Sequence, residues 1–269
     1  MFRYYPYVPG PYLPDGLRLL HISNDPAETA RAPVGDSLLG DVVLCLENLK
    51  ALLGNHRPKL TKARETVAHH MAPHGPAAAQ RDGEGRLTAA QLFRALNQIR
   101  PANTIVVEES PSNIPDPHTE WPSIEPDTFY TAASGILGWS LPAAAGIALA
   151  ERDAGRNRPV VAIIGEGSFQ YSVQSLWTAA QLRLPIFFVE PRNDEYAILK
   201  AFAVAEESPG VPGMDIPGFD IVSIAKGYGC DAARLDDVEA IKKAAAAAWT
   251  KSKPTVLEVP ISKQVPPLL

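Results

Sequence analysis

From residue 88 onward, the chain alternates between helical segments and short, continuous apolar runs rich in β-branched residues. The clearest runs lie at residues 104–107, 160–164, 186–189 and 255–259. Continuous runs, unlike alternating ones, are typical of strands that are buried on both faces. Buried strands separated by helices predict an α/β fold, in which a doubly wound parallel sheet carries helices on both faces.

Capping signals mark where the helices between these runs begin and end. Thr88 and Gln91 have the spacing of a capping box, which predicts a helix that stops before Pro101. Pro142 suits the first turn of a buried helix that follows a glycine-rich loop. Further helices are predicted near residues 171–182, 220–227 and 236–249.

The first part of the chain is less regular. Residues 18–23 predict a buried strand, and apolar residues recur at helical spacing over residues 38–53. Residues 55–85 are rich in His, Pro, Gly, Ala and charges without periodicity, which predicts a linker. The predicted organisation is therefore a partial domain at 1–54, a linker at 55–85 and the α/β domain at 86–269. One strand and one helix cannot form a core, so we expect the partial domain to pack on the rest of the chain or on a partner.

Composition limits the classes of partner. The chain has 25 basic and 30 acidic residues, a formal charge of -5 and no basic stripe, so neither nucleic acid nor an anionic membrane is expected. Residues 128–150 carry no charge, but their glycines and Pro142 favour a loop and a buried helix over a membrane span. The absence of a signal-peptide pattern at the start, and two cysteines without disulfide or zinc spacing, suit the cytoplasm.

The most informative turn follows the run at 160–164. Gly165 and Gly167 let the backbone approach a ligand, and the helix that follows offers N–H groups to an anion. Glu166 would repel a bare phosphate, so the turn makes sense if a divalent cation such as Mg²⁺ lies between them. Asn193, after the next run, could supply an amide oxygen. The same residues also fit a tight turn with a solvated glutamate, and a third glycine that would indicate a dinucleotide site is absent.

This turn is part of a longer pattern. Residues 165–167, Gly-Glu-Gly, are followed by 24 residues and then by Arg192 and Asn193. The pattern resembles the thiamine diphosphate motif, which is Gly-Asp-Gly, about two dozen residues, and Asn-Asn. The chain resembles the thiamine-diphosphate-dependent 2-oxo acid decarboxylases, and among them the benzoylformate decarboxylases, over nearly its whole length. The segments that carry this resemblance are 2–5, 25–26, 30–33, 135–146, 171–180, 211–218 and 225–229.

The resemblance implies an architecture and an activity. Members of this family have a pyrimidine-binding domain, a middle domain and a carboxy-terminal diphosphate-binding domain. Residues 1–54 resemble the back half of the Rossmann-like middle domain, and residues 86–269 resemble the whole diphosphate-binding domain. The implied reaction is the non-oxidative decarboxylation of an apolar 2-oxo acid to an aldehyde, with thiamine diphosphate and Mg²⁺ as cofactors. The pyrimidine-binding domain, which lends a glutamate to a neighbouring subunit, is outside the resemblance. We therefore expect a separate partner chain or a homo-oligomer, and no activity of this chain alone.

Carried over by position, the resemblance also assigns single residues. Glu166, the side chain of Asn193 and the carbonyl of Glu195 fall on the metal ligands. The cofactor-binding positions are Pro111, Ser112, Gly135, Leu137 (the apolar wedge), Gly165, Gly167, Ser168, Asn193 and Tyr196. Ile198 and Phe202 fall on the substrate side, and Tyr5 falls where benzoylformate decarboxylases have an active-site histidine.

Four positions depart from the family pattern. Glu166 replaces aspartate, and Pro111 replaces a threonine that offers a donor. Arg192 replaces the first asparagine, and it either pairs with the diphosphate or displaces the ion. Tyr5 is a poorer proton shuttle than histidine at neutral pH. Two alternatives therefore stay open: an inactive, cofactor-free remnant that acts as a binding or assembly protein, and a truncated enzyme similar to acetolactate synthase.

Overall fold

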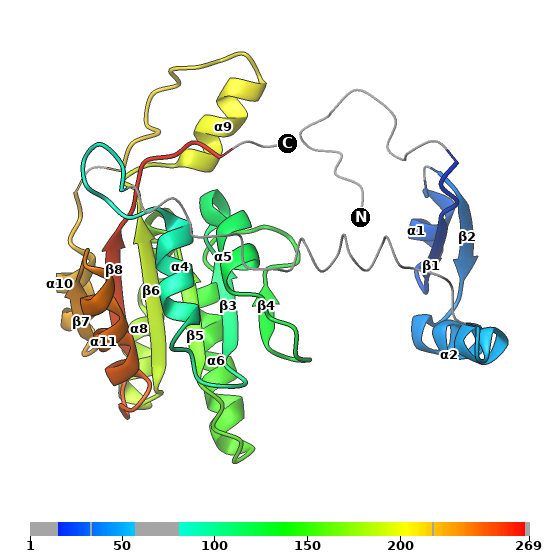
Figure 1. Cartoon of the computed structure of the whole chain (residues 1–269), viewed down its shortest axis with the longest axis horizontal. Coiled ribbons are helices and arrows are strands. Elements are labelled where there is room, and N and C mark those ends of the chain that lie inside the picture. Colours follow the sequence, from blue (N-terminus) through cyan, green and yellow to red (C-terminus); the bar gives the residue numbers. More distant parts are fainter. Residues whose placement is uncertain (1–15, 33, 57–80, 217, 267–269) are drawn as a thin grey trace. The chain divides into compact units, whose positions relative to one another are not determined.

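The structure is a computed structural model of the 269-residue chain, and it describes residues 16–32, 34–56, 81–216 and 218–266. The chain divides into two compact units, residues 1–68 and 69–269 (Figure 1). Among the helices in the described part of the chain, none is long and apolar enough to cross a membrane.

The described residues of the first unit form two short strands and two helices. They are β1 (Leu20–Ser23), α1 (Pro26–Ala30), β2 (Asp36–Leu39) and α2 (Val42–Leu53), and the two strands pair in parallel. The prediction of helical structure from residue 38 is wrong at its start, because Leu38 and Leu39 belong to β2. Asp41 begins α2, where its carboxylate accepts the N–H of Leu44 (3.0 Å). The apolar spacing runs unbroken from strand to helix, so it could not reveal this boundary.

The apolar side chains of the first unit are mostly exposed. Within residues 16–32 and 34–56, only Ser23 is buried. The exposed large apolar residues are Leu17, Leu20, Leu38, Leu39, Val42, Val43, Leu44, Leu46, Leu49, Leu52 and Leu53. So much exposed apolar surface is unusual for a soluble unit that has no partner.

The second unit contains a sheet of six parallel strands. Its order is β4-β3-β5-β6-β8-β7, and every neighbouring pair is parallel, so the predicted fold class is confirmed. The strands are β3 (Ile105–Glu109), β4 (Phe129–Thr131), β5 (Val160–Ile164), β6 (Ile186–Arg192), β7 (Asp231–Arg234) and β8 (Thr255–Pro260). The four central strands are those that the apolar runs predicted. The edge strands β4 and β7 were missed because they are short, and β7 reads Asp-Ala-Ala-Arg.

Helices cover both faces of this sheet (Figure 1). On one face lie α6 (Ser140–Asp153), α8 (Ser175–Gln181) and α10 (Ile221–Gly227); on the other lie α4 (Ala89–Asn97) and α11 (Val238–Ala248). Val160, Ala162 and Ile164 of β5 pack under the first group, whereas Val161 and Ile163 pack under the second. Because every position of β5 faces one of two apolar layers, its sequence shows no alternation.

Some of the predicted helix boundaries are confirmed, and others are wrong. The capping box is confirmed, because Gln91 N donates to Thr88 Oγ1 (3.2 Å) and Thr88 N donates to Gln91 Oε1 (2.9 Å). Asp220 caps α10 as predicted, whereas α8 begins at Ser175, later than residue 171. The sequence did not predict the short elements η1 (Pro111–Asn113), α5 (Pro115–Glu120), α7 (Glu166–Phe169) and α9 (Ala197–Ala205).

Two described segments of the second unit that are far apart in the sequence, one before α4 and one after β8, are paired. Leu87 forms a parallel bridge with Ile261, and Ser262 N donates to the carbonyl of Leu87 (2.7 Å). This short pairing follows the last strand, β8, and precedes the first helix, α4.

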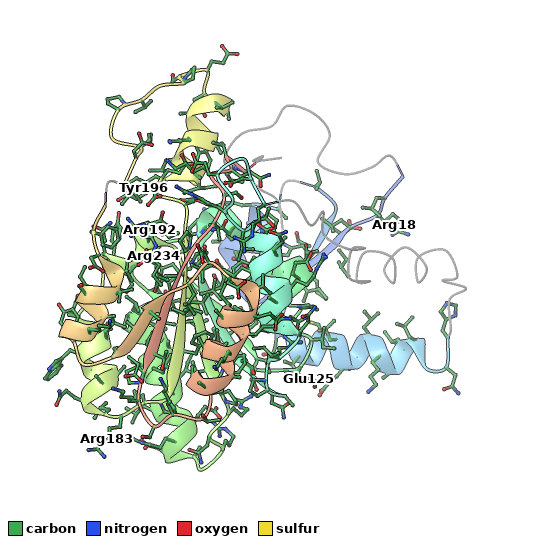
Figure 2. The ribbon with its side chains drawn as sticks, turned by 60° about the vertical axis from the view of Figure 1, so that its left-hand side comes forward. Arg18, Glu125, Arg183, Arg192, Tyr196 and Arg234 are labelled. Carbon is green, nitrogen blue, oxygen red and sulfur yellow. The ribbon has the colours of Figure 1, made fainter. Side chains whose placement is uncertain are left out.

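Three glutamates share one face of the sheet near the carboxyl ends of its strands. Glu109, Glu190 and Glu258 each stand two residues beyond a core residue that faces α6, α8 and α10, so they project to that face. Glu190 is paired in register with Glu258. Glu258 accepts from Arg192 (3.0 Å) and lies 3.1 Å from Arg234. Figure 2 labels both arginines. This pair of arginines compensates the buried charge of Glu258.

Glu190 has no such compensation. It is fully buried, and neither side-chain oxygen has a hydrogen-bond partner among the residues that the structure describes. Burial raises the pKa of Glu190 well above its ordinary value, and the nearby carboxyls of Glu166, Glu258 and Glu109 raise it further. A neutral carboxylic acid is the less costly form in such a place.

We predict that Glu190→Leu raises the free energy of unfolding by about 1–3 kcal/mol, because a buried, unpaired polar group disappears. The gain should be larger at pH 8 than at pH 5. A carboxyl whose pKa is raised in the folded state binds more protons there than in the unfolded state, so its contribution to stability falls as pH rises. Urea denaturation at both pH values measures this.

Glu258→Leu is the matched control, because Glu258 lies on the same face of the sheet as Glu190. It leaves the buried Arg192 without one of its carboxylate partners, and it should lower the free energy of unfolding by about 3 kcal/mol. Destabilisation by both substitutions would contradict the unpaired state of Glu190.

Candidate functional site

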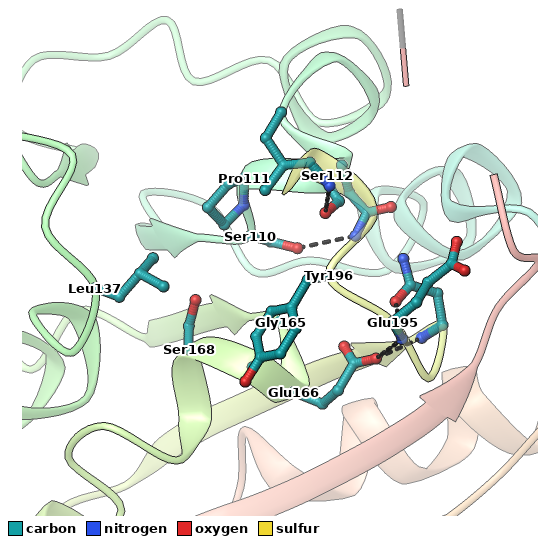
Figure 3. A pocket seen from close by; sticks show the side chains of 13 residues that line it. Ser110, Pro111, Ser112, Leu137, Gly165, Glu166, Ser168, Glu195 and Tyr196 are labelled. Atoms are coloured by element: carbon teal, nitrogen blue, oxygen red, sulfur yellow. Dashed lines mark hydrogen bonds between the residues drawn. The ribbon is translucent and has the colours of Figure 1, made fainter. Parts of the chain in front are cut away.

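A pocket opens at the carboxyl ends of β3, β5 and β6. β4 and β5 lie on opposite sides of β3, so the strand order reverses at this point. Ligands of parallel α/β sheets bind at such switch points. The pocket is lined by Ser110, Pro111, Ser112, Asn113, Leu137, Gly165, Glu166, Gly167, Ser168, Asn193, Glu195, Tyr196 and Ile198 (Figure 3).

Most of the residues that the resemblance assigned lie around this pocket, two described ones do not, and one lies outside the described residues. Gly135 lies in the loop before α6, with a left-handed φ of 67°, and Phe202 lies further along α9. Neither lines the pocket. Tyr5 lies outside the described residues. Conversely, Ser110 and Asn113 line the pocket without having been predicted, although they flank Pro111 and Ser112.

Glu166 and Asn193 converge on one backbone group. Glu166 is 3% exposed, and its Oε1 accepts the N–H groups of Asn193 (3.1 Å) and Glu195 (3.3 Å). The N–H of Glu195 is also accepted by Asn193 Oδ1 (3.1 Å). A carboxylate oxygen and an amide oxygen therefore meet at the same donor, and Figure 3 shows Glu166 directed at the Glu195 backbone.

The pKa of Glu166 lies close to neutral pH, so both its neutral and its charged form are populated there. Burial raises the pKa of this carboxyl, and the surrounding backbone N–H groups offset only part of that effect, so the pKa is about 7. A cation bound against the carboxylate would favour its charged form.

The donor set at this place fits a divalent cation. Carboxylate and amide oxygens are the ligands that Mg²⁺ prefers, and both are supplied from neighbouring strands. The side chain of Glu195 is bound elsewhere: its carboxylate accepts from Lys200 Nζ, which also donates to Asp215 (2.7 Å). This agrees with a contribution from the backbone of Glu195 rather than from its side chain.

Of the two glycines in the turn, Gly167 is required by packing. A Cβ at this residue would lie 2.6 Å from Cε1 of Tyr196, which is closer than real Cβ atoms approach. A Cβ at Gly165 would make only an ordinary contact with Ser110 Oγ at 3.6 Å. The ring of Tyr196 thus rests against α7 because residue 167 has no side chain (Figure 3).

Two serine hydroxyls connect the end of β3 to its surroundings. Ser112 Oγ accepts the N–H of Ile198 (3.0 Å) and so caps the first turn of α9. Ser110 Oγ accepts from the side-chain amide of Asn113 (3.0 Å). Each hydroxyl keeps its own hydrogen, which can be donated to an anionic ligand.

A further buried carboxylate, that of Glu109, holds the loop that carries Leu137. Its two oxygens accept the backbone N–H groups of Gly138 and Ser140 (2.6 Å for the latter). Glu109 was not among the predicted residues, because the apolar run ends at Val107 whereas β3 continues to Glu109. The polar end of this strand is part of the support of the site.

Arg192 is turned away from the pocket. It lines a separate hollow with Phe219, Asp220 and Arg234. Its Nε donates to Asp194 (2.6 Å), and its Nη1 donates to Glu258. Both roles expected of Arg192, pairing with the diphosphate and displacing the ion, are therefore wrong for this arrangement. The expectation failed because the partners that turn the side chain away could not be read from the motif.

The chain is similar to known proteins over most of its length. Residues 118–259 match the family model described as thiamine pyrophosphate enzyme, C-terminal TPP binding domain. Benzoylformate decarboxylase of Pseudomonas aeruginosa is 38% identical over 260 residues, which cover 97% of this chain and 47% of that protein.

Solved structures of similar proteins also cover nearly the whole of this chain. Benzoylformate decarboxylase from Polynucleobacter necessarius is 40% identical with a TM-score of 0.83, over 99% of this chain and 48% of that one. The 4-hydroxybenzoylformate decarboxylase of Rhodococcus jostii RHA1 is 33% identical with a TM-score of 0.84, over 98% of this chain and 48% of that one. The chain thus spans about half the length of the relatives that it matches.

We predict that Glu166 makes the protein less stable as pH rises from 4.5 to above 7. Its folded pKa is raised, so the folded state binds more protons than the unfolded state within this window, and the free energy of unfolding falls. Glu166→Gln should remove about 3 kcal/mol of this decline. Denaturant titrations from pH 4 to pH 8, without metal, measure it.

Glu151→Gln is the control for this experiment. Arg158 and Arg156 hold the pKa of Glu151 at about 2, so its contribution to stability is lost only as pH falls through the range below 4.5. This variant should be less stable at neutral pH while keeping the decline between pH 4.5 and 7. An unchanged decline in Glu166→Gln would argue against the burial of an acid with a raised pKa.

Proposed function

The chain belongs to the family of thiamine pyrophosphate enzymes, as its sequence predicted, and we propose that it is the diphosphate- and Mg²⁺-binding part of a decarboxylase similar to benzoylformate decarboxylase. The proposed reaction converts an apolar 2-oxo acid into an aldehyde and carbon dioxide. The observation that carries the proposal is the convergence of Glu166 Oε1 and Asn193 Oδ1 on the N–H of Glu195. This convergence lies where a phosphate-bound cation can reach the carboxyl end of the sheet.

Each part of the pocket has a function under this proposal. Glu166, the side chain of Asn193 and the carbonyl of Glu195 hold Mg²⁺. Thiamine diphosphate, when bound, supplies the electron sink for the loss of carbon dioxide. The cofactor-binding positions beside the metal ligands hold and orient the diphosphate; they are Pro111, Ser112, Gly165, Gly167, Ser168 and Tyr196.

The remaining assigned residues support the cofactor and the substrate. Leu137 lines the pocket on the loop that Glu109 fixes, which supports its assignment as the apolar wedge beneath the cofactor. The carbonyl of Gly135 accepts from the aminopyrimidine. Ile198 and Phe202 on α9 offer apolar surface to the side chain of the 2-oxo acid, and Tyr5 completes the substrate side.

The proposal requires a further polypeptide region. The relatives are about twice as long as this chain, so half of their sequence has no counterpart here. A pyrimidine-binding region completes the site, either as a partner chain or within a homo-oligomer. The exposed apolar side chains of α2, and Leu199 and Val204 of α9, support such an association. The proposed place of action is the cytoplasm.

A second candidate, a cofactor-free assembly protein, is favoured by one observation. Glu166 already accepts the N–H groups of Asn193 and Glu195, so the turn is held together without an ion. Under this alternative the carboxylate has a purely structural use. Binding experiments separate the two candidates.

We predict that the chain binds thiamine diphosphate with a micromolar Kd only when Mg²⁺ is present. Glu166→Gln and Asn193→Leu should each weaken binding at least tenfold, because each removes a hard oxygen ligand. Isothermal titration calorimetry measures both. Glu239→Gln, on the exposed side of α11, is the control and should bind normally. If the wild-type chain gives no binding signal in calorimetry, the result would favour the cofactor-free assembly protein.

We also predict that the purified chain with Mg²⁺, thiamine diphosphate and benzoylformate releases no aldehyde. Activity should appear when the amino-terminal half of a benzoylformate decarboxylase is added, because that half carries the missing region. Aldehyde release is followed in a coupled assay. Sustained turnover by the chain alone would reject the need for a partner.

A further inference from the structure

The turn that brings Asn193 and Glu195 to Glu166 contains a residue in an unfavourable conformation. Asp194 has a φ of 62°, in the left-handed region, where a residue with a side chain pays a cost that glycine does not. Its neighbours on both sides donate backbone N–H groups to Glu166. The convergence in the pocket therefore depends on the conformation of Asp194.

We propose that Arg192 and Asp194 form an ion-pair clamp that keeps the 193–195 turn in the shape required for binding Mg²⁺. Arg192 acts here as a positioning residue, because it does not line the pocket itself. The part of the proposal that concerns Mg²⁺ rests on the proposed function. The part that concerns the shape of the turn does not.

Arg192 is a rigid anchor. Its side chain is 6% exposed, and its Nη1 donates to Glu258 Oε1 (3.0 Å) and to the carbonyl of Phe219 (2.9 Å). The guanidinium also lies over the ring of Phe219, 5.4 Å from its centroid. Because β8 and the segment before α10 hold the guanidinium, its Nε is a fixed donor for Asp194.

Asp194 is held on both of its side-chain oxygens and through its backbone. Oδ1 accepts from Arg192 (2.6 Å), and Oδ2 accepts from Arg86 (3.2 Å). Its carbonyl accepts the N–H of Ile216 (2.9 Å). A short, charge-assisted bond between residues two apart in sequence restrains the backbone between them.

The clamp also explains how a cation is tolerated next to a cation site. The charge of Arg192 is paired with Asp194 and Glu258, and its side chain faces the hollow on the other side of β6. The substitution of arginine for the first asparagine of the motif is thereby compensated within the same turn.

The test is a set of variants read by Mg²⁺ binding, with Mg²⁺ alone as the probe in calorimetry. Arg192→Gln should weaken Mg²⁺ binding about tenfold, because Asp194 loses its restraint. Adding Asp194→Gly to Arg192→Gln should recover most of this loss, since glycine adopts the left-handed conformation without a clamp. Arg152→Gln, which removes an exposed pair with Asp153, is the control and should not change binding.

A thermodynamic cycle on stability gives a second measurement. Arg192→Gln and Asp194→Asn, each alone and together, should show a coupling of about tenfold in the unfolding equilibrium, equal to about 1.4 kcal/mol. Asparagine removes the charge that pairs with Arg192, but it adopts the left-handed conformation less readily than glycine, so Asp194→Asn loses the clamp without gaining the freedom of glycine. Should Arg192→Gln fail to fold, Asp194→Asn and Asp194→Gly in the wild-type background still test the clamp: the first should weaken Mg²⁺ binding more than the second.

The outcomes separate the two proposals. Absence of Mg²⁺ binding by the wild-type chain rejects the proposed function, whereas coupling in the stability cycle would still support the clamp. Zero coupling, or no recovery of Mg²⁺ binding in the double variant with glycine, overturns the clamp.

Discussion

The N–H of Glu195 is the group on which the candidate site depends. Two oxygens from neighbouring strand ends, one of Glu166 and one of Asn193, accept this single donor. Such a meeting is possible because β5 and β6 are parallel and adjacent, so that the turns after both strands lie at one edge of the sheet. The pocket is thus a consequence of strand order as well as of residue identity.

The same end of the sheet contains several buried carboxylates, and hydrogen bonds or ion pairs stabilise three of them. Glu109 accepts two backbone N–H groups, Glu166 accepts two others, and Glu258 pairs with two arginines. Glu190 alone lacks such partners among the described residues. A buried charge is costly without compensation, and burial accordingly raises the pKa of Glu190 well above its ordinary value. Whether a carboxylate at the site has partners therefore depends on the hydrogen bonds and ion pairs around it, and not on how many charged residues the chain contains.

The sequence predicted the central strands and the place of the turn, because both depend on local patterns. Val160 to Ile164 read as a buried strand since every position faces an apolar layer. Leu38 and Leu39 were misassigned because their spacing fits helix and strand equally well. The orientation of Arg192 was not predictable, since it is decided by Glu258, 66 residues later in the chain. The burial of Glu109 and the short edge strands β4 and β7 were not predicted either, because tertiary contacts decide them as well.

The pairing of Leu87 with Ile261 has a consequence for how the second unit fits into a longer polypeptide. Among the described residues, Leu87 precedes all six strands of the sheet in the sequence, Ile261 follows them, and the two residues are paired just beyond the end of β8. A module built in this way can be joined to additional domains at either terminus without any strand changing its neighbours. Recombination of whole domains would therefore leave the candidate pocket unchanged.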